Sequence, residues 1–285
     1  MTERMVPAGD AQLCAEAFGS PADPTILLIG GAAASMDYWE DEFCSRLAAA
    51  GRHVIRYDFR DTGRSSHYPA GAPGYTGDDL VTDALAVLDG YGVAAAHLYG
   101  VSMGGGIAQE LAVEYPERVL SLTLQSTSPA GPGGPDRPDL PPMSPRLAEL
   151  FASEQPAPDW SDRDAAISAL VDGLRAFDGT IAPDAEERAV AARMYDRTID
   201  VAASQTNHWI LDGGGLDRGK LAEVTAPTLV LHGTADPLLP YPHGEALANE
   251  IPGARLVPLA GMGHQYPLRA VWDTVVAEVA AHTAR

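Results

Sequence analysis

The sequence predicts an α/β fold with a mostly parallel central sheet, flanking helices and a helical insertion. Three observations support this prediction. Short apolar runs of strand length alternate with amphipathic segments of helix length, a pattern typical of a parallel sheet covered on both faces. A proline-rich segment, 129–145, interrupts the alternation, and the residues after it keep helical spacing to about Lys220. Finally, a serine set among glycines lies directly between an apolar run and a helix.

The predicted strands and helices follow from hydrophobic periodicity and from the residues that end each segment. Residues 4–18 predict a hairpin that turns at Gly9. The predicted strands are Thr25–Ile29, His53–Tyr57, Ala96–Tyr99, Val119–Leu124, Thr228–Leu231 and Arg255–Leu259. The predicted helices are 37–50, Asp78–Asp89, Met103–Glu114, Tyr241–Glu250 and Leu268–Ala281. Gly51, Gly90 and Pro116 follow three of these helices, as expected for residues that end a helix.

The long interval between two of the predicted strands predicts a separate helical unit. Seven prolines within 129–145 disfavour both helix and strand pairing, so this stretch predicts a linker or hinge. We therefore expect a core of residues 1–128 and 221–285, and a linker with a helical cap over residues 129–220. A subdomain that only adds stability is the alternative to a cap.

Residues 100–104, GVSMG, match the pattern G-x-S-x-G. The pattern alone is weak, but here an apolar strand leads into it and a helix leaves it, as in a nucleophile elbow. A turn this tight exposes the Ser102 hydroxyl, and the glycines at both ends of the motif avoid clashes. The helix N-terminus also directs backbone N–H groups at the site. Gly105 and Gly106 are expected to allow close packing of helix and sheet.

A serine hydroxyl needs a base to become a nucleophile, and the base needs an orienting group. His264 is the best candidate base because it follows the last predicted strand and lies among glycines. Asp236 lies in an Asp-Pro turn after a strand and is the candidate carboxylate. The chain order Ser102, Asp236, His264 is that of the α/β hydrolases. His208, in the predicted cap, is a candidate for substrate contact.

An oxyanion produced by serine attack needs two hydrogen-bond donors. Small residues follow the first core strand, over positions 30–35, and let a backbone N–H approach a substrate. We assign the donors to the Ala32 and Met103 N–H groups, and Gly31 is the alternative to Ala32.

These motifs make the chain resemble the α/β-hydrolase superfamily. GGAAASMDYW is similar to the family's HGxxxSxxxW, with Gly30 where histidine is common. YDFRDTGRSS resembles its DxRGxGxS, with Asp61 in place of glycine. Within 1–125 and 221–285 the chain more narrowly resembles the aclacinomycin methylesterases, which tailor anthracyclines, whereas the likeness fades in the predicted cap. The resemblance implies an α/β-hydrolase fold and puts the same three triad residues and two oxyanion donors on the family's positions.

The predicted activity is cleavage of a carboxylic ester by a serine hydrolase through an acyl-enzyme. The resemblance implies a methyl ester of an aromatic polyketide as the substrate. Hydrolysis of a C–C bond or lactone, or cofactor-free perhydrolysis, uses the same triad and stays open, as does a non-hydrolytic ligand-binding protein. We expect no cofactor and no metal site, because His232 and His243 lack companion ligands at useful spacing.

Composition limits the partners and the compartment. The chain carries 39 acidic and 19 basic residues, a formal charge of −20, so a basic nucleic-acid-binding face is not expected. The longest apolar run, Thr25–Ala34, is too short to span a membrane, and the first ten residues lack a signal-peptide pattern. We expect a cytoplasmic protein with a small-molecule substrate, an oligomeric state that the sequence does not determine, and buried free thiols at Cys14 and Cys44.

Overall fold

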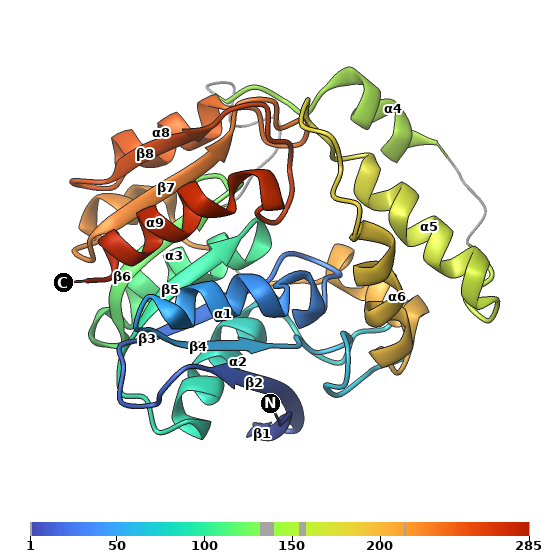
Figure 1. The fold of residues 1–285 in the computed structure, drawn as a ribbon, viewed down its shortest axis with the longest axis horizontal. Coiled ribbons are helices and arrows are strands. Elements are labelled where there is room, and N and C mark those ends of the chain that lie inside the picture. Colours follow the sequence, from blue (N-terminus) through green and yellow to red (C-terminus); the bar gives the residue numbers. More distant parts are fainter. Residues whose placement is uncertain (1, 132–139, 154–157, 214, 285) are drawn as a thin grey trace.

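An eight-stranded sheet crosses the molecule, and helices cover both of its faces (Figure 1). The computed structural model describes residues 2–131, 140–153, 158–213 and 215–284. The strands are β1 (Arg4–Ala8), β2 (Ala11–Phe18), β3 (Thr25–Ile29), β4 (His53–Tyr57), β5 (Ala96–Val101), β6 (Val119–Gln125), β7 (Thr228–Gly233) and β8 (Arg255–Leu259). Their order is β1-β2-β4-β3-β5-β6-β7-β8.

The first two strands form the predicted hairpin, and β2 continues antiparallel to β4. All pairings from β4 through β3, β5, β6 and β7 to β8 are parallel. The prediction of a mostly parallel sheet is therefore confirmed. Parallel strands end at the same edge of the sheet, so the segments that follow β3, β5, β7 and β8 come together there.

The helices that flank the sheet divide between its two faces. They are α1 (Asp41–Ala49), α2 (Gly77–Gly90), α3 (Met103–Glu114), α8 (Pro242–Glu250) and α9 (Trp272–His282). Helices α1 and α9 pack on one face and α2, α3 and α8 on the other. Alternate residues of a strand serve the two faces, since Leu27 and Ile29 belong to one cluster and Ile26 and Leu28 to the other.

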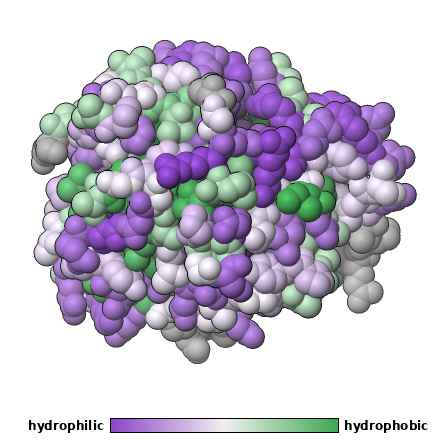
Figure 2. All heavy atoms as spheres, turned by 90° about the horizontal axis from the view of Figure 1, so that it is seen from below, coloured by the Kyte–Doolittle hydropathy of each residue, from purple (hydrophilic) through white to green (hydrophobic). Residues whose placement is uncertain are grey.

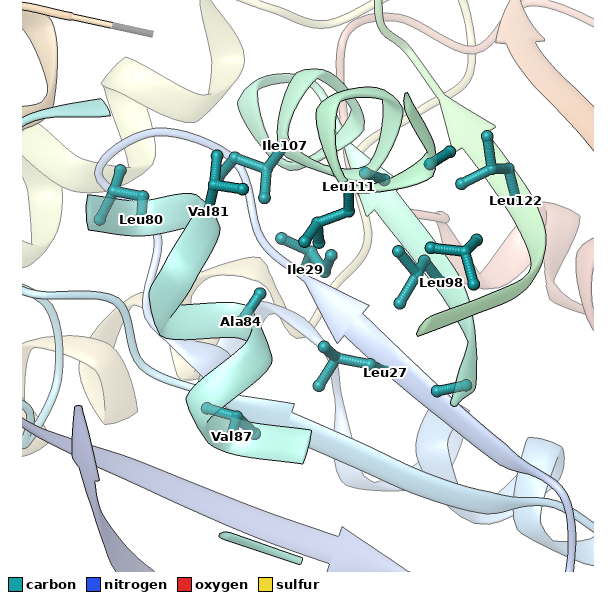
Figure 3. Packing of buried hydrophobic residues seen from close by; sticks show 14 of the residues in the cluster. Leu27, Ile29, Leu80, Val81, Ala84, Val87, Leu98, Ile107, Leu111 and Leu122 are labelled. Atoms are coloured by element: carbon teal, nitrogen blue, oxygen red, sulfur yellow. The ribbon is translucent and has the colours of Figure 1, made fainter. Parts of the chain in front are cut away.

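The larger core cluster is formed where α2 and α3 cover the middle strands. Figure 3 shows Val81 of α2 beside Ile107 of α3, with Ala84 of α2 and Ile29 of β3 close by; Leu98 of β5 belongs to the same cluster. These side chains are at most 6% exposed. This packing holds α3, and therefore the serine at its N-terminus, firmly against the sheet.

The first predicted helix begins later than expected. A 3₁₀ turn, Met36–Tyr38, is capped by the Ser35 side chain, and α1 starts only at Asp41. Trp39 thus lies between the two elements rather than inside a helix. It is nevertheless only 1% exposed, because the turn directs its ring onto Phe43, with ring centroids 5.9 Å apart.

Between β6 and β7 the described regular elements are all helical. They are α4 (Pro145–Ala152), α5 (Arg163–Arg175), α6 (Glu187–Arg197), α7 (Val201–Thr206), and the 3₁₀ segments Asn207–Trp209 and Arg218–Glu223. We call residues 140–153, 158–213 and 215–223 the helical insertion. Figure 1 shows α4, α5 and α6 at one end of the sheet, with α5 and α6 side by side. Part of the predicted linker, 129–145, falls on residues 132–139, which lie outside the described residues; its described part has no helix or strand before α4 begins at Pro145.

Arg197, the last residue of α6, ties the helical insertion to the core. Its guanidinium pairs with Asp58 at 2.7 Å and Glu3 at 2.9 Å and also contacts Asp37. Asp58 follows β4 and is fully buried, and an arginine that satisfies a buried carboxylate is costly to remove. Figure 2 shows hydrophilic residues spread over one face of the molecule, with smaller hydrophobic groups between them.

Candidate active site

Ser102 occupies the turn between β5 and α3. Its backbone angles, φ 53° and ψ −117°, lie in a region that non-glycine residues rarely adopt. The Ser102 N–H donates to the Gln125 carbonyl at 3.0 Å, and the Thr127 hydroxyl donates to the Ser102 carbonyl at 2.9 Å. The end of β6 therefore holds the strained residue through both of its backbone polar groups.

The two outer glycines of the motif are required by close backbone contacts. A Cβ added at Gly100 would lie 2.2 Å from the Gly104 carbonyl oxygen. A Cβ at Gly104 would lie 2.3 Å from the Gly30 carbonyl oxygen. The prediction that these positions must be small to avoid clashes is confirmed.

Gly105 and Gly106, which follow the motif, differ in how closely other residues pack against them. A Cβ at Gly105 would lie 2.6 Å from the Thr127 side chain, so this glycine does allow close packing. Apart from its chain neighbours and the backbone of its own helix, no atom of the described structure would lie within 4 Å of a Cβ at Gly106. The prediction for Gly106 was therefore wrong, because its Cα faces away from the sheet.

The structure brings Ser102, His264 and Asp236 into one hydrogen-bonded series. Ser102 Oγ lies 2.9 Å from His264 Nε2, and His264 Nδ1 lies 2.9 Å from Asp236 Oδ2. The three residues follow β5, β8 and β7, whose carboxyl ends share one edge of the sheet. The backbone N–H of His264 also donates to the Phe177 carbonyl of the helical insertion at 2.9 Å.

Asp236 is buried but remains suited to carrying a negative charge. Its Oδ1 accepts the backbone N–H groups of Leu238 at 2.9 Å and Leu239 at 2.8 Å. Burial alone would raise the pKa of Asp236, but the hydrogen bond and charge of His264, with the Leu239 N–H, outweigh it and hold this pKa below its usual value. An ionised Asp236 accepts a hydrogen bond from His264 Nδ1–H and so keeps the ring proton on Nδ1, which leaves Nε2 free to accept the Ser102 hydroxyl proton.

A second histidine, His232, lies beside the carboxylate. Its Nε2 is 2.7 Å from the Leu239 carbonyl oxygen and 3.6 Å from Asp236 Oδ2. A carbonyl only accepts, so Nε2 carries the proton. Burial lowers the pKa of His232, which keeps the ring neutral. From the sequence, His232 was weighed only as a metal ligand, although its position four residues before Asp236 places the two side chains near each other.

The segment after β3 contains a backbone N–H group that has no acceptor among the described residues. The Gly31 N–H donates to the Tyr266 hydroxyl at 2.7 Å, and the Ala33 N–H donates to His208 Nδ1 at 2.9 Å. Between them, the Ala32 N–H has no acceptor among the described residues, and neither has the Met103 N–H in the first turn of α3. Gly31, the alternative to Ala32, is therefore already occupied.

A cavity of about 810 Å³ lies over the serine and is lined by residues of both the core and the helical insertion. Ser102 and His264 line it. So do three aromatic residues of the insertion, with ring centroids 6.3 Å apart for Phe151–Phe177 and 6.4 Å for Phe151–Trp209. Ala32, Met103 and His208 also line it. The cavity can hold a bulky apolar molecule against the serine.

The described residues contain no group of three or more His, Cys, Asp or Glu side chains placed to hold a metal ion. Within the same residues no helix has the length and apolarity needed to cross a membrane.

The strand–turn–helix at Ser102, the histidine after β8 and the carboxylate after β7 define an α/β hydrolase. The chain belongs to the alpha/beta hydrolase fold family, whose model matches residues 24–266. Rhodomycin D methylesterase DauP of Streptomyces sp. (strain C5) is 39% identical over 301 residues, covering 99% of this chain and 98% of the relative. Rhodomycin D methylesterase DnrP of Streptomyces peucetius has the same identity and coverage.

Solved structures agree on the fold. A 2-hydroxy-6-oxo-6-phenylhexa-2,4-dienoate hydrolase (BphD) from Rhodococcus sp. strain RHA1 has a TM-score of 0.77 at 22% identity, covering 100% of this chain and 99% of the other. An esterase, RhEst1 from Rhodococcus sp. ECU1013, has the same TM-score, identity and coverage. The resemblance to this superfamily and to its methylesterases is confirmed, and carboxylic ester hydrolase, the predicted enzyme class, is also the class of both Streptomyces relatives.

Proposed function

We propose that this protein is a serine carboxylic ester hydrolase in which Ser102 is the nucleophile, His264 the general base and Asp236 the group that orients the base. The observation that carries the proposal is the pair of 2.9 Å contacts that join the hydroxyl to the imidazole and the imidazole to the carboxylate. Both are of hydrogen-bond length and in the order that activates a serine.

The reaction proceeds in two halves. Ser102 Oγ attacks the ester carbonyl carbon while His264 Nε2 accepts the hydroxyl proton, and Asp236 stabilises the imidazolium that forms. The tetrahedral oxyanion accepts the Ala32 and Met103 N–H groups, neither of which has an acceptor among the described residues. Collapse breaks the ester C–O bond, and the leaving alkoxide takes the proton from His264. Water then attacks the acyl-enzyme by the same route and releases the acid and Ser102.

The substrate that best fits is a methyl ester of an aromatic polyketide of the anthracycline kind. Two relatives that span the whole chain are named as rhodomycin D methylesterases, and Phe151, Phe177 and Trp209 give the cavity an aromatic wall. Trp209 is 56% exposed, so a substrate ring that covers it would bury apolar surface. Residues 129–220 act as linker and cap over a core of residues 1–128 and 221–285. A cytoplasmic location stays a prediction.

Covalent labelling tests the nucleophile. A fluorophosphonate probe should add one adduct to the wild-type protein by intact mass and none to Ser102→Ala. Ser128→Ala is the matched control, because Ser128 lines the same cavity but contacts His243 rather than His264, and it should label fully. Absence of labelling in folded wild-type protein would contradict the proposal and favour a non-hydrolytic ligand-binding protein.

Product analysis tests the bond that is cleaved. Release of methanol and free acid from an aromatic polyketide methyl ester supports the proposed substrate. Ring-opened lactone products, C–C cleavage products or peracid instead of methanol would identify one of the alternative reactions of the same triad. Trp209→Ala should raise KM for the aromatic ester and leave hydrolysis of p-nitrophenyl acetate unchanged, since the acetate is too small to reach that wall.

A further inference from the structure

Side chains of the helical insertion form hydrogen bonds with both backbone polar groups of Ala33, the residue next to the proposed oxyanion donor. The Ala33 N–H donates to His208 Nδ1 at 2.9 Å, and the Ala33 carbonyl accepts the Gln205 side-chain amide at 3.1 Å and the Ser204 hydroxyl at 3.4 Å. Ala33 has φ 61°, a left-handed conformation that is unfavourable for alanine and persists only when its surroundings hold it.

His208 has the protonation state that this contact needs. Its Nε2 lies 2.9 Å from the Arg60 carbonyl oxygen, which can only accept, so Nε2 carries the proton and Nδ1 is an acceptor. Burial lowers the pKa of His208 to about 4 even though the Arg60 carbonyl and the charge of Asp61 favour the protonated form. The ring is therefore neutral near pH 7 and accepts the Ala33 N–H.

Tyr266 holds the other side of the same loop. Its hydroxyl accepts the Gly31 N–H at 2.7 Å and would lie 3.0 Å from a Cβ at Gly30, so a side chain at position 30 would crowd this hydroxyl. The N–H groups of residues 31 and 33 are thus fixed by partners from two distant segments. The Ala32 N–H between them has no acceptor among the described residues, and Ala32 lines the cavity over the serine.

We propose that His208 is a positioning residue: the helical insertion, through His208, holds the Ala33 peptide so that the neighbouring Ala32 N–H stays aimed at the oxyanion. The insertion then contributes to the rate of the chemical step as well as to substrate binding, and Tyr266 supports the loop from the opposite side. This inference rests on the proposed function, and it goes beyond the substrate contact expected of His208 from the sequence.

Two substitutions separate the two hydrogen bonds of the ring. In His208→Asn the amide oxygen can take the place of Nδ1 and accept the Ala33 N–H, whereas the bond to Arg60 is lost. In His208→Gln the amide nitrogen can take the place of Nε2 and keep the Arg60 bond, whereas the Ala33 acceptor is lost. The proposal requires that His208→Asn retain most of the activity and that His208→Gln lose it.

The assay is hydrolysis of p-nitrophenyl acetate, which is too small to depend on the cap for binding. Because loss of a whole oxyanion donor lowers kcat about 10²- to 10³-fold, displacement of the donor in His208→Gln should lower kcat by about 10- to 100-fold with KM nearly unchanged. An alkyl boronic acid forms a tetrahedral adduct on serine. It should bind His208→Gln more weakly, so its inhibition constant should rise by the same factor.

The matched control is His97→Gln. His97 is a buried histidine of β5 whose Nδ1 contacts the Ser121 hydroxyl at 2.8 Å, away from the loop, so this variant should lose stability and keep kcat. If His208→Gln does not fold, Tyr266→Phe tests the same loop, since it removes only the hydroxyl that holds Gly31, and it should also lower kcat at constant KM.

Equal kcat in His208→Gln and wild type, or equal losses in the Asn and Gln variants with a raised KM, would overturn the positioning role. Unchanged kcat in Tyr266→Phe would overturn the support from the opposite side. The proposed function is tested separately with the wild-type protein. If this protein is neither labelled by fluorophosphonate nor able to hydrolyse the ester, the proposed function itself is refuted, whatever the His208 variants do.

Discussion

Gly104 should be among the least replaceable residues of the chain, while Gly106, two positions further in the same helix, should tolerate alanine. A Cβ at Gly104 would lie 2.3 Å from the Gly30 carbonyl oxygen and 2.4 Å from that of Ile29, whereas ordinary contact begins at 3.4 Å, so α3 would have to move by about 1 Å. Both contacted atoms belong to the backbone of β3 and the loop after it, and neither can rotate away.

The magnitude follows from two opposing effects. Overpacking of this kind costs about 3 kcal/mol, the upper end of the usual range, while alanine in place of glycine in a helix returns about 1 kcal/mol. Gly104→Ala should therefore lower the free energy of unfolding by about 2 kcal/mol. The Cβ added in Gly106→Ala meets no atom of the described structure within 4 Å beyond its chain neighbours and the backbone of its own helix, so this variant should raise the free energy of unfolding by about 0.5–1 kcal/mol.

Urea unfolding of the two variants and the wild type measures these differences, and kcat on p-nitrophenyl acetate measures the effect on the site. Gly104→Ala should also lower kcat, because the displaced contact leads into the loop that carries the Ala32 N–H. Equal stabilities of the two variants, or a Gly104→Ala protein with wild-type stability and kcat, would refute the argument from close backbone contact.

Three further predictions concern charge and thiols. Asp236→Asn should keep the fold but lower kcat on the order of 10⁴-fold, because the amide stabilises neither the correct tautomer of its histidine partner nor the imidazolium; a loss below tenfold in steady-state kinetics would contradict this. Burial lowers the pKa of His97 and His208 from 6.5 to about 4, so the unfolded chain binds protons that the native state does not. The free energy of unfolding should therefore keep its full contribution from these two histidines above pH 6.5 and decrease as the pH falls towards 4. His208 alone should lower it by about 1.4 kcal/mol per pH unit, and His97 should lower it further. Urea unfolding between pH 7 and 5 checks the sign, and a stability that rises on acidification would oppose it. Burial raises the pKa of the Cys14 and Cys44 thiols to about 12, so Ellman's reagent should react with neither in the native protein and with both after unfolding; rapid reaction before unfolding would contradict burial.

Residues close in the chain carried most of the successful predictions. The strand–turn–helix around Ser102 was predictable because hydrophobic periodicity and glycine spacing act over a few residues. Asp236 and His264 were predictable as candidates because each follows a strand, and parallel strands present their carboxyl ends at one edge. The start of α1 was not predictable from the sequence. The Ser35 side chain caps a separate 3₁₀ turn before the helix, and this turn leaves the apolar spacing unchanged.

The contacts that refine the site were hidden because they join residues far apart in the chain. His208 meets Ala33, Tyr266 meets Gly31, and Arg197 meets Asp58. Each contact depends on how the helical insertion or a late loop packs on the core, and no local pattern encodes that packing. His208 accordingly looked like a substrate contact, although its ring nitrogens are both engaged by the backbone of the core.

The sequence by itself determined the class of fold, the nucleophile motif and the residue types that can activate it, because propensity, periodicity and turn chemistry are local properties of a chain. Only the tertiary structure decided the strand order, the 2.9 Å spacings that join hydroxyl, imidazole and carboxylate, and the choice of Ala32 over Gly31 as the free donor. The strand order, these spacings and the free N–H of Ala32 all depend on hydrogen bonds between groups that are distant in the chain. Such groups come together only when the helices pack on the sheet.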